Sequence, residues 1–364
     1  MSKKGYYKIG YLPNPLNKKV GRISIKGRSC RIVIPARVNT FFCHDNFFAY
    51  PLRKQVYPVN SINFAVAKFT EATVTLRDDK RIIIAAADKH HAIIEHAVKI
   101  MKKTLRIENG FNVSANNLHE ISHGGLGSSS AIMSAVAQAI NILMGSTLSV
   151  GDMTKLISQN YGEESSKSGH VSSAISIGGA TAIGLSGKSL VIMGGESEMW
   201  NLSSLPKEYC AVLLYPKKLK KINKATDDAL NKKDFSLYDS WEDVRENILK
   251  TKVIPTIGRK DYSVLFKTIN MYTIGAYGSI LQYYKLRWIS HGINFDSLIY
   301  NIFSNIFSSL KVDENCLFVS SNGPLIVIIT KHPKKTLHLV NDLNKNFIIE
   351  KVSLHNGINY QLEK

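Results

Sequence analysis

The chain has 364 residues, of which 44% are apolar and 21% charged, a balance that predicts folded domains and excludes a disordered chain. Lys and Arg outnumber Asp and Glu by 47 to 28, and the formal net charge of +19 either attracts an anionic partner or simply keeps the protein soluble. The length is ample for two domains.

In the first half of the chain, the apolar pattern alternates between strand and helix periodicity. The basic first thirty residues predict an arm or an added edge strand, and a loop is expected over residues 36–48. Residues 81–86 are expected to form a hairpin with the strand before them. Strands are predicted at residues 30–35, 61–68, 72–77 and 111–117. Helices are predicted at residues 89–105, 131–144 and 150–162, and residues 171–190 predict a closely packed helix followed by strands.

Around residue 205 the alternation of strands and helices starts again. Pro333 stands at the first position of a predicted helix, where a proline is well tolerated. Strands are predicted at residues 208–215, 316–321, 324–330 and 347–354, and helices at 236–250, 262–285, 296–310 and 333–344. Two such mixed sets predict an α+β protein with one domain over residues 1–204 and a second over residues 205–364.

Three further features narrow the partner and the compartment. The lysine clusters at residues 217–221 and 331–335 lack interleaved aromatic residues, so nucleic acid is not the expected partner. No apolar run approaches the ~18 residues that cross a bilayer, and the first residues lack the apolar core of a signal peptide. The four cysteines show neither metal-ligand nor disulfide spacing. We therefore expect a cytoplasmic protein with a small anionic substrate and no membrane partner, and a homodimer stays open.

The segment that follows His123 carries the clearest chemistry. Its glycines permit a positive φ and let the backbone approach a ligand closely, and an apolar helix comes directly after it. Free N–H groups and the dipole at the start of a helix favour phosphate. The segment lacks the Gly-Lys-Ser/Thr ending of a Walker A loop. The residues that we expect to bind a nucleotide-type phosphate are Gly124, Gly125, Leu126, Gly127, Ser128, Ser129 and Ser130.

This loop, with Ala131, resembles the central motif Pro-x-x-x-Gly-Leu-Gly-Ser-Ser-Ala of the GHMP superfamily, named for galactokinase, homoserine kinase, mevalonate kinase and phosphomevalonate kinase. Residues 35–39, Pro-Ala-Arg-Val-Asn, are similar to the first motif of that superfamily. The resemblance implies a two-domain GHMP kinase fold, with an N-terminal α/β domain like that of ribosomal protein S5 and a ferredoxin-like α+β C-terminal domain. It also implies ATP and Mg²⁺ as cofactors, and Arg37, Asn39 and His44 as substrate-binding residues.

The third, glycine-rich motif of the superfamily has its best match in residues 320–324. This loop looks more like the corresponding loop of the β-ribofuranosylaminobenzene 5′-phosphate synthases. Those enzymes share the kinase fold but transfer ribose phosphate from phosphoribosyl diphosphate. An ordinary hairpin turn at Asn322 and Gly323 explains the same residues equally well.

The resemblance leaves the catalytic base open. Many family kinases carry a catalytic Asp in a Ser-Gly-x-Asp-Asn segment, and residues 168–179 align with that stretch and place Val171 at the Asp position. Valine cannot accept a proton. His170 and Asp45 are the candidates for replacing the base, and Lys167 is a candidate phosphate clamp. A structural histidine and an exposed lysine are the plainer interpretations.

A carboxylate near this segment ligates Mg²⁺ in the family, together with a serine of the central motif. By match that serine is Ser129, and we favour Glu164 over Glu163 as the carboxylate. Both glutamates could equally be solvated surface residues.

Resemblance and charge together predict an ATP- and Mg²⁺-dependent kinase that phosphorylates a hydroxyl group of a small anionic metabolite. The preferred class is mevalonate or a phosphomevalonate, in isoprenoid biosynthesis. One alternative is a ribosyl-phosphate transferase of the synthase branch that uses phosphoribosyl diphosphate. A second alternative is a non-catalytic relative that binds a ligand, which Val171 and the degenerate third loop favour and the intact central loop opposes.

Overall fold

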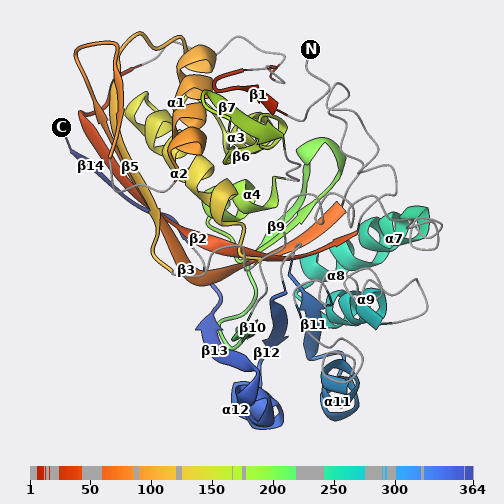
Figure 1. Ribbon diagram of the computed structural model, residues 1–364. Helices are drawn as coiled ribbons and strands as arrows, with labels where there is room; N and C mark the ends of the chain where they lie inside the picture. Colours follow the sequence, from red (N-terminus) through yellow and green to blue (C-terminus); the bar gives the residue numbers. More distant parts are fainter. Residues whose placement is uncertain are drawn as a thin grey trace.

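The computed structural model describes residues 6–11, 13, 16, 24–42, 60–85, 90–119, 125–165, 167–173, 178–218, 242–274, 289, 292, 301–320, 324–355 and 357–363. Two long, curved antiparallel strands, β2 (Ser29–Phe42) and β3 (Asn60–Leu76), run across the molecule at its centre (Figure 1). The described strands around them follow the order β14-β2-β3-β5-β4, and β8 also pairs with β3 and with β9. The other members are β4 (Ile82–Ile84), β5 (Phe111–Asn117), β8 (Leu190–Met193), β9 (Met199–Ser203) and β14 (Asn359–Glu363).

Two predictions for this sheet are wrong. The loop expected from residue 36 begins no earlier than residue 43, because β2 passes through a register shift between Pro35 and Ala36 and then continues pairing with β3. A bulge of this kind accommodates a proline, which has no N–H to donate to the ladder. The hairpin expected for residues 81–86 does not form, since β4 lies parallel to β5 instead.

Four helices cover one face of this sheet (Figure 1). They are α1 (His91–Leu105), α2 (Ser128–Leu143), α3 (Val150–Gln159) and α4 (Gly179–Ser186). The apolar residues that predicted α1 are buried, including Ile93, Ala97 and Ile100. Helix α2 begins three residues earlier than predicted and is buried on nearly every side, because it packs against α1, α3, α4 and the sheet.

The first described residues form the predicted edge strand. Strand β1 (Tyr6–Lys8) lies at the edge of a small antiparallel sheet with the order β1-β7-β6. Strand β1 pairs with β7 (His170–Ser173), and β7 in turn forms a hairpin with β6 (Gly162–Glu163).

The second half of the chain forms the predicted ferredoxin-like arrangement, with antiparallel strands in the order β11-β12-β10-β13 and the element sequence βαββαβ. The strands are β10 (Cys210–Pro216), β11 (Asn315–Val319), β12 (Ile326–Thr330) and β13 (Phe347–Ser353). The helices are α7 (Glu242–Ile248), α8 (Ile254–Gly258), α9 (Ser263–Ile274), α11 (Asn301–Ser309) and α12 (Pro333–Val340), with a π-helical turn at Leu249–Val253 between α7 and α8. The fold is therefore α+β, as the sequence predicts.

Alternate residues of β10 face two apolar clusters. Val212 and Leu214 pack against α11 and α12, whereas Ala211 and Leu213 pack against α8 and α9 and against residues of the first half, among them Leu126. The glycine-serine loop is thus anchored where the two halves meet, and the domain boundary between residues 204 and 205 stays a prediction.

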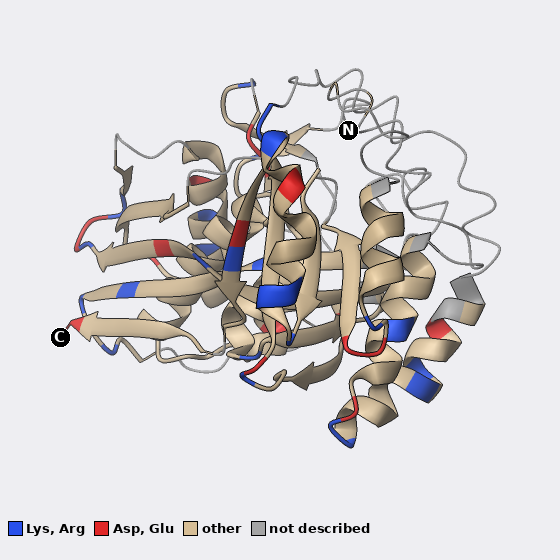
Figure 2. Cartoon of the chain, turned by 90° about the horizontal axis from the view of Figure 1, so that it is seen from below, with Lys and Arg blue, Asp and Glu red and all other residues tan. Residues whose placement is uncertain are grey.

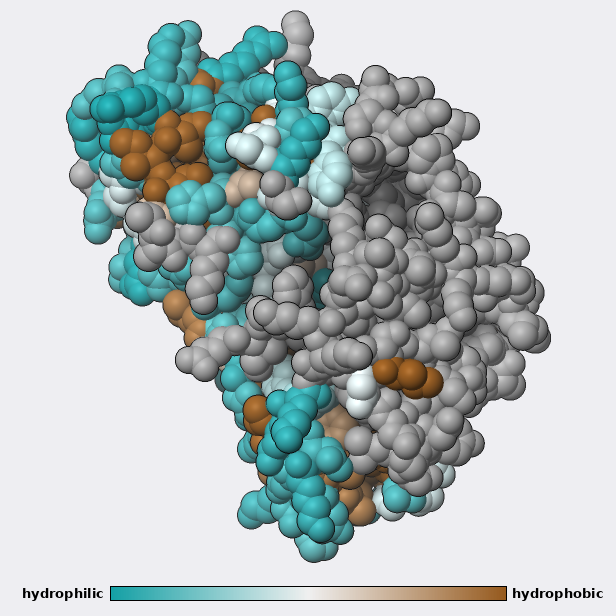
Figure 3. All heavy atoms as spheres, in the orientation of Figure 1, coloured by the Kyte–Doolittle hydropathy of each residue, from teal (hydrophilic) through white to brown (hydrophobic). Residues whose placement is uncertain are grey.

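On the face drawn in Figure 3, most described residues at the surface are hydrophilic, and apolar residues gather at the upper left. None of the described helices is both long enough and apolar enough to cross a membrane.

Candidate active site

The described part of the glycine-serine loop, residues 125–130, turns into the start of α2. Gly125 and Gly127 have φ of 87° and 69°, values that favour glycine. Gly127 is the N-cap, makes no side-chain cap and is followed by no acidic residue in the first turn. Leu126 is almost fully buried and holds the loop to the core. The first N–H groups of α2 are therefore not satisfied by a cap, which is what an anion at a helix start requires.

Two segments that the sequence singled out, residues 35–39 and the start of residues 320–324, meet at this loop. The Ser320 hydroxyl donates to the Gly125 carbonyl at 2.6 Å and accepts the Asn39 N–H at 3.1 Å. The Arg37 N–H donates to the Leu126 carbonyl at 3.2 Å. A Cβ at Gly125 would lie only 2.5 Å from the Ser320 carbonyl oxygen, so the loop packs closely on this segment. Residues 321–323 of the third motif lie outside the described residues.

The guanidinium of Arg37 lies beside the starts of two helices. A Cβ at Gly127 would be 3.0 Å from Arg37 Nη2 and 3.3 Å from the Cβ of Ala180 in the first turn of α4. Helix α4 also starts after a glycine, Gly178, without a side-chain cap or an acidic first turn. Arg37 donates a hydrogen bond to Asn39 Oδ1. Two positive helix ends and a guanidinium repel one another, so their closeness favours an anion among them.

The irregularity in β2 turns these side chains toward the helices. Before it, Cys30, Ile32 and Ile34 pack in the cluster beneath α1 and α2, whereas Ala36 and Val38 after it belong to the cluster shared with the second half. Odd-numbered residues after Pro35 therefore face the helices. Bulges near functional sites commonly redirect a side chain in this way.

Arginines before the irregularity have a different role. Arg31 makes two 2.8 Å hydrogen bonds to the carboxylate of Glu71 on β3, and this pair holds the pKa of Glu71 below its ordinary value. Basic and acidic residues lie next to one another on the strands in Figure 2. Such pairs neutralise charge on the sheet surface, unlike Arg37, which faces the loop.

Tyr161 connects the loop to a carboxylate. Its hydroxyl donates to Glu163 Oε1, and Ser130 and Ser129 in the first turn of α2 lie near enough to it to lower its pKa. Burial, and then the charge of Glu163, raises the pKa of Tyr161 well above its ordinary value, so the hydroxyl stays protonated. Glu164 has another partner, because its Oε1 accepts the Ile93 N–H in the first turn of α1 at 3.2 Å. Of the two glutamates, Glu163 is the one linked to Ser129.

The β6–β7 hairpin places His170 and Val171 on opposite faces. Glu163 pairs with Ser172, so Glu163 and His170 share one face of the hairpin, and Val171 lies on the other. Val171 is fully buried there, and a Cβ at Gly162 would lie 2.7 Å from its Cγ2. The residue aligned with the family Asp thus points away from the face that carries Glu163. The Nδ1 of His170 is 2.8 Å from the Ser168 carbonyl oxygen.

The remaining predicted residues divide into two groups. Lys167 is exposed in the turn between β6 and β7. Its hydrogen bonds to other described residues are with Ser165 and His170, and not with the glycine-serine loop. Asp45, His44 and Gly124 lie outside the described residues. Sequence reasoning did not include Tyr161, although its position two residues before Glu163 is the spacing that puts two side chains on one face of an extended chain.

The groups at this site fit the two implied cofactors. Uncapped N–H groups, glycines and a guanidinium are suited to the phosphates of ATP. The hydroxyl of Ser129 and the carboxylate of Glu163 are oxygen donors, the kind that Mg²⁺ prefers. The assignment of Ser129 and Glu164 as metal ligands stays a prediction.

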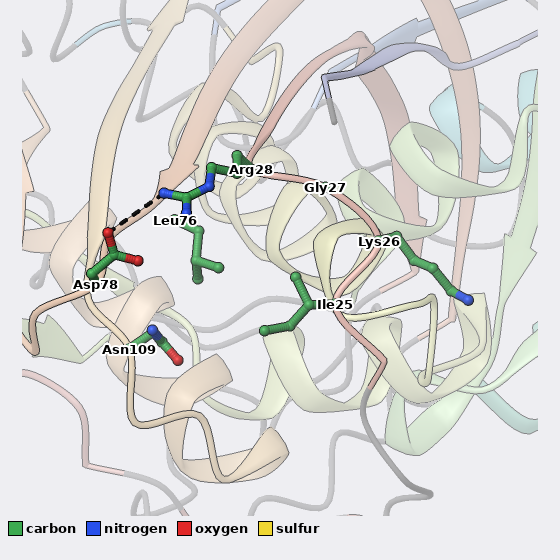
Figure 4. A pocket seen from close by; sticks show the side chains of 7 residues that line it. All are labelled: Ile25, Lys26, Gly27, Arg28, Leu76, Asp78 and Asn109. Atoms are coloured by element: carbon green, nitrogen blue, oxygen red, sulfur yellow. Dashed lines mark hydrogen bonds and ion pairs between the residues drawn. The ribbon is translucent and has the colours of Figure 1, made fainter.

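A separate hollow lies beyond the other end of β2 and β3 (Figure 4). It has a volume of about 480 Å³. Arg28 and Asp78 point toward each other across it, 3.5 Å apart, and both side chains are largely exposed. The lining residues are Ile25, Lys26, Gly27, Arg28, Leu76, Asp78 and Asn109, and none of them belongs to the glycine-serine loop.

Comparison with known proteins agrees with this geometry. Residues 92–180 match the family described as GHMP kinases N terminal domain. No curated protein sequence matches the chain. Homoserine kinase from Cytophaga hutchinsonii has a similar structure, with a TM-score of 0.59 and 15% identity over 94% of this chain and 100% of that one.

Two further solved structures share the fold. Mevalonate diphosphate decarboxylase from Staphylococcus aureus has a TM-score of 0.62 and 15% identity, over 92% of this chain and 98% of that one. Mevalonate kinase from Methanococcus jannaschii has a TM-score of 0.55 and 16% identity, over 90% of this chain and 98% of that one. Residues 92–180 thus match a GHMP kinase N-terminal domain, and the chain shares the GHMP kinase fold over nearly its whole length.

Proposed function

We propose that this protein is an ATP-dependent kinase that transfers a phosphoryl group to a hydroxyl of a small anionic metabolite. The observation that carries the proposal is the uncapped start of α2, where Gly127 lies against the guanidinium of Arg37 and the start of α4. Phosphoryl transfer depends chiefly on positioning and on stabilising negative charge, and these groups supply both.

In this proposal each group has a distinct task. The N–H groups after Gly127 bind the phosphate chain, and Arg37 stabilises the negative charge that spreads over the transferred group. Mg²⁺, when bound, neutralises phosphate charge, and Ser129 with Glu163 would hold it. His170 shares a hairpin face with Glu163 and is the candidate that would accept the hydroxyl proton of the substrate.

The preferred acceptor is mevalonate or a phosphomevalonate. Two considerations support this class: one of the similar structures is a mevalonate kinase, and the net charge of +19 suits a substrate that bears a carboxylate or phosphate. Homoserine is the competing acceptor, since another similar structure is a homoserine kinase. The ribosyl-phosphate transferase is the second candidate function, because Ser320 of the synthase-like third loop contacts Gly125 directly.

A binding and turnover panel tests these proposals. Thermal unfolding would be measured with ATP and with phosphoribosyl diphosphate, each with and without Mg²⁺, because a ligand of the folded state raises its apparent stability. Phosphorus NMR would then follow ATP with mevalonate, phosphomevalonate and homoserine. We expect stabilisation by ATP and formation of ADP with one acceptor. Stabilisation by phosphoribosyl diphosphate alone would replace the kinase with the transferase, and binding of neither would reject both.

A further inference from the structure

We propose that Tyr161 is a positioning residue that selects Glu163 as the metal-binding carboxylate and holds it beside Ser129 at the start of α2. The inference rests on the proposed function and adds a residue to its site. It is drawn from one juxtaposition, in which a single buried hydroxyl is hydrogen-bonded to the carboxylate and lies near the first turn of the phosphate-binding helix.

The hydrogen-bonding pattern gives Tyr161 a definite orientation. Its proton goes to Glu163 Oε1, and its oxygen is left able to accept from the hydroxyls of Ser130 and Ser129, which lie near it. The phenol thus lies between the carboxylate and the serines. A carboxylate has two oxygens, and the second oxygen of Glu163 stays available for a cation. Partners behind the ligands of a metal site commonly orient them in this manner.

The main chain of Tyr161 is also held from the other side. The Tyr7 hydroxyl on β1 donates to the carbonyl oxygens of Tyr161 and Asn160. The Asn160 carbonyl lies 2.8 Å from Nε2 of His96, and the Asn160 side chain donates to the Pro13 carbonyl at 3.2 Å. The N-terminal strand therefore fixes the backbone from which Tyr161 extends toward α2.

The neighbouring glutamate shows what the choice depends on. Glu164 follows Glu163 directly but accepts an N–H from Ile93 at the start of α1. A carboxylate at that helix end is favoured by the local dipole. Adjacent residues of an extended chain point to opposite sides, so only one of the two can face the serines. The Tyr161 hydroxyl fixes which one does.

Manganese binding measured by electron paramagnetic resonance, in the presence of ADP, tests the proposal without relying on turnover. For Tyr161→Phe we expect Mn²⁺ affinity to fall about 10- to 100-fold, the usual effect of losing a partner behind a metal ligand. Glu163→Gln should weaken Mn²⁺ at least as much. The double variant should lose little more than Glu163→Gln alone, because the tyrosine acts through the carboxylate.

Matched controls separate positioning from simple destabilisation. Glu164→Gln keeps the length of the side chain and removes its charge, and it should change Mn²⁺ affinity less than about twofold. Metal-free ADP affinity of Tyr161→Phe should also stay within about twofold of the unchanged protein. Unchanged Mn²⁺ affinity in Tyr161→Phe, or a loss in Glu164→Gln instead, overturns this inference while ADP binding by the unchanged protein keeps the proposed function. Absence of nucleotide binding in the unchanged protein rejects the proposed function itself.

Discussion

The helix starts on one face of the N-terminal sheet fall into two kinds. Helix α3 begins with a complete capping box, in which Ser149 and Asp152 satisfy each other's backbone N–H groups at 3.2 and 3.1 Å. Helix α1 receives the carboxylate of Glu164. Helices α2 and α4, by contrast, begin after left-handed glycines without any side-chain cap or acidic first turn.

This difference separates structural from ligand-binding polarity. At a capped helix start the backbone N–H groups already donate to a side chain of the same protein, which takes the place of a bound anion. The starts of α2 and α4 have no side-chain cap, and they are the two that lie beside Arg37. Internal satisfaction of polar groups, rather than polarity itself, therefore distinguishes the site from its surroundings.

The largest expected effect comes from placing a side chain in the loop before the uncapped start of α2. Gly125→Ala places a Cβ 2.5 Å from the Ser320 carbonyl oxygen at a φ of 87°. We expect a strain of about 3 kcal/mol and a loss of ATP affinity or turnover of about 100-fold or more. Calorimetric ATP titration measures it. The control is Gly258→Ala, where a Cβ meets nothing within 4 Å, and an equal loss there would contradict the explanation.

A buried histidine with both ring nitrogens hydrogen-bonded tests the polar groups that are satisfied within the chain. His96 Nδ1 accepts the Gly10 N–H at 2.8 Å, and Nε2 lies 2.8 Å from the Asn160 carbonyl. Burial lowers the pKa of His96 from 6.5 to about 4; the Asn160 carbonyl and the charge of Glu95 oppose this shift, and the charges of Lys103 and Lys99 add to it. Between these values the unfolded chain binds more protons, so the stability contributed above pH 6.5 is lost as pH falls toward 4.

We expect this loss to reach about 3 kcal/mol in the free energy of unfolding. Urea unfolding at pH 7 and pH 4, in the unchanged protein and in His96→Gln, measures it. The glutamine can still donate to the Asn160 carbonyl but does not titrate, so the variant should lose this share of the pH dependence. Identical pH profiles for both proteins would show that His96 is not the responsible group.

Replacing the guanidinium sharpens the contrast between two arginines of one strand. Arg37→Gln removes the charge beside the open helix starts, and we expect the affinity for ATP or the acceptor to fall about 30-fold, or about 2 kcal/mol. Arg31→Gln breaks a surface pair with Glu71, in which the Arg31 side chain is 51% exposed, and should change binding less than about twofold. Equal effects of the two variants would mean that net charge alone drives binding.

The smallest expected effect is the loss of a cap. Ser149→Ala removes the capping box of α3 and should lower the free energy of unfolding by about 1 kcal/mol. ATP affinity should be unchanged, since this helix start is already satisfied within the chain. Urea unfolding and calorimetry on the same sample measure both quantities, and a weakened affinity for ATP would blur the distinction between open and closed starts.

How much the sequence could predict varies with the range of the interaction. Helix α1 and strand β5 follow from local apolar spacing, and the loop before α2 follows from its glycines. The reversal of faces at Pro35 could not be predicted, because it depends on how many residues β3 places opposite β2. The partners of Glu163 and Glu164 depend likewise on the hairpin register and on the distant start of α1.

The pairing of β14 with β2 carries a consequence for how this protein is made. Residues 359–363 hydrogen-bond along Ser29–Val33, a few residues before the turn that aims Arg37. Among the described strands β14 comes last in the chain, so this edge of β2 is unpaired until residues 359–363 have been synthesised. A chain that lacks residues 359–363 should therefore expose the backbone hydrogen-bonding groups of Ser29–Val33 to strands of other chains.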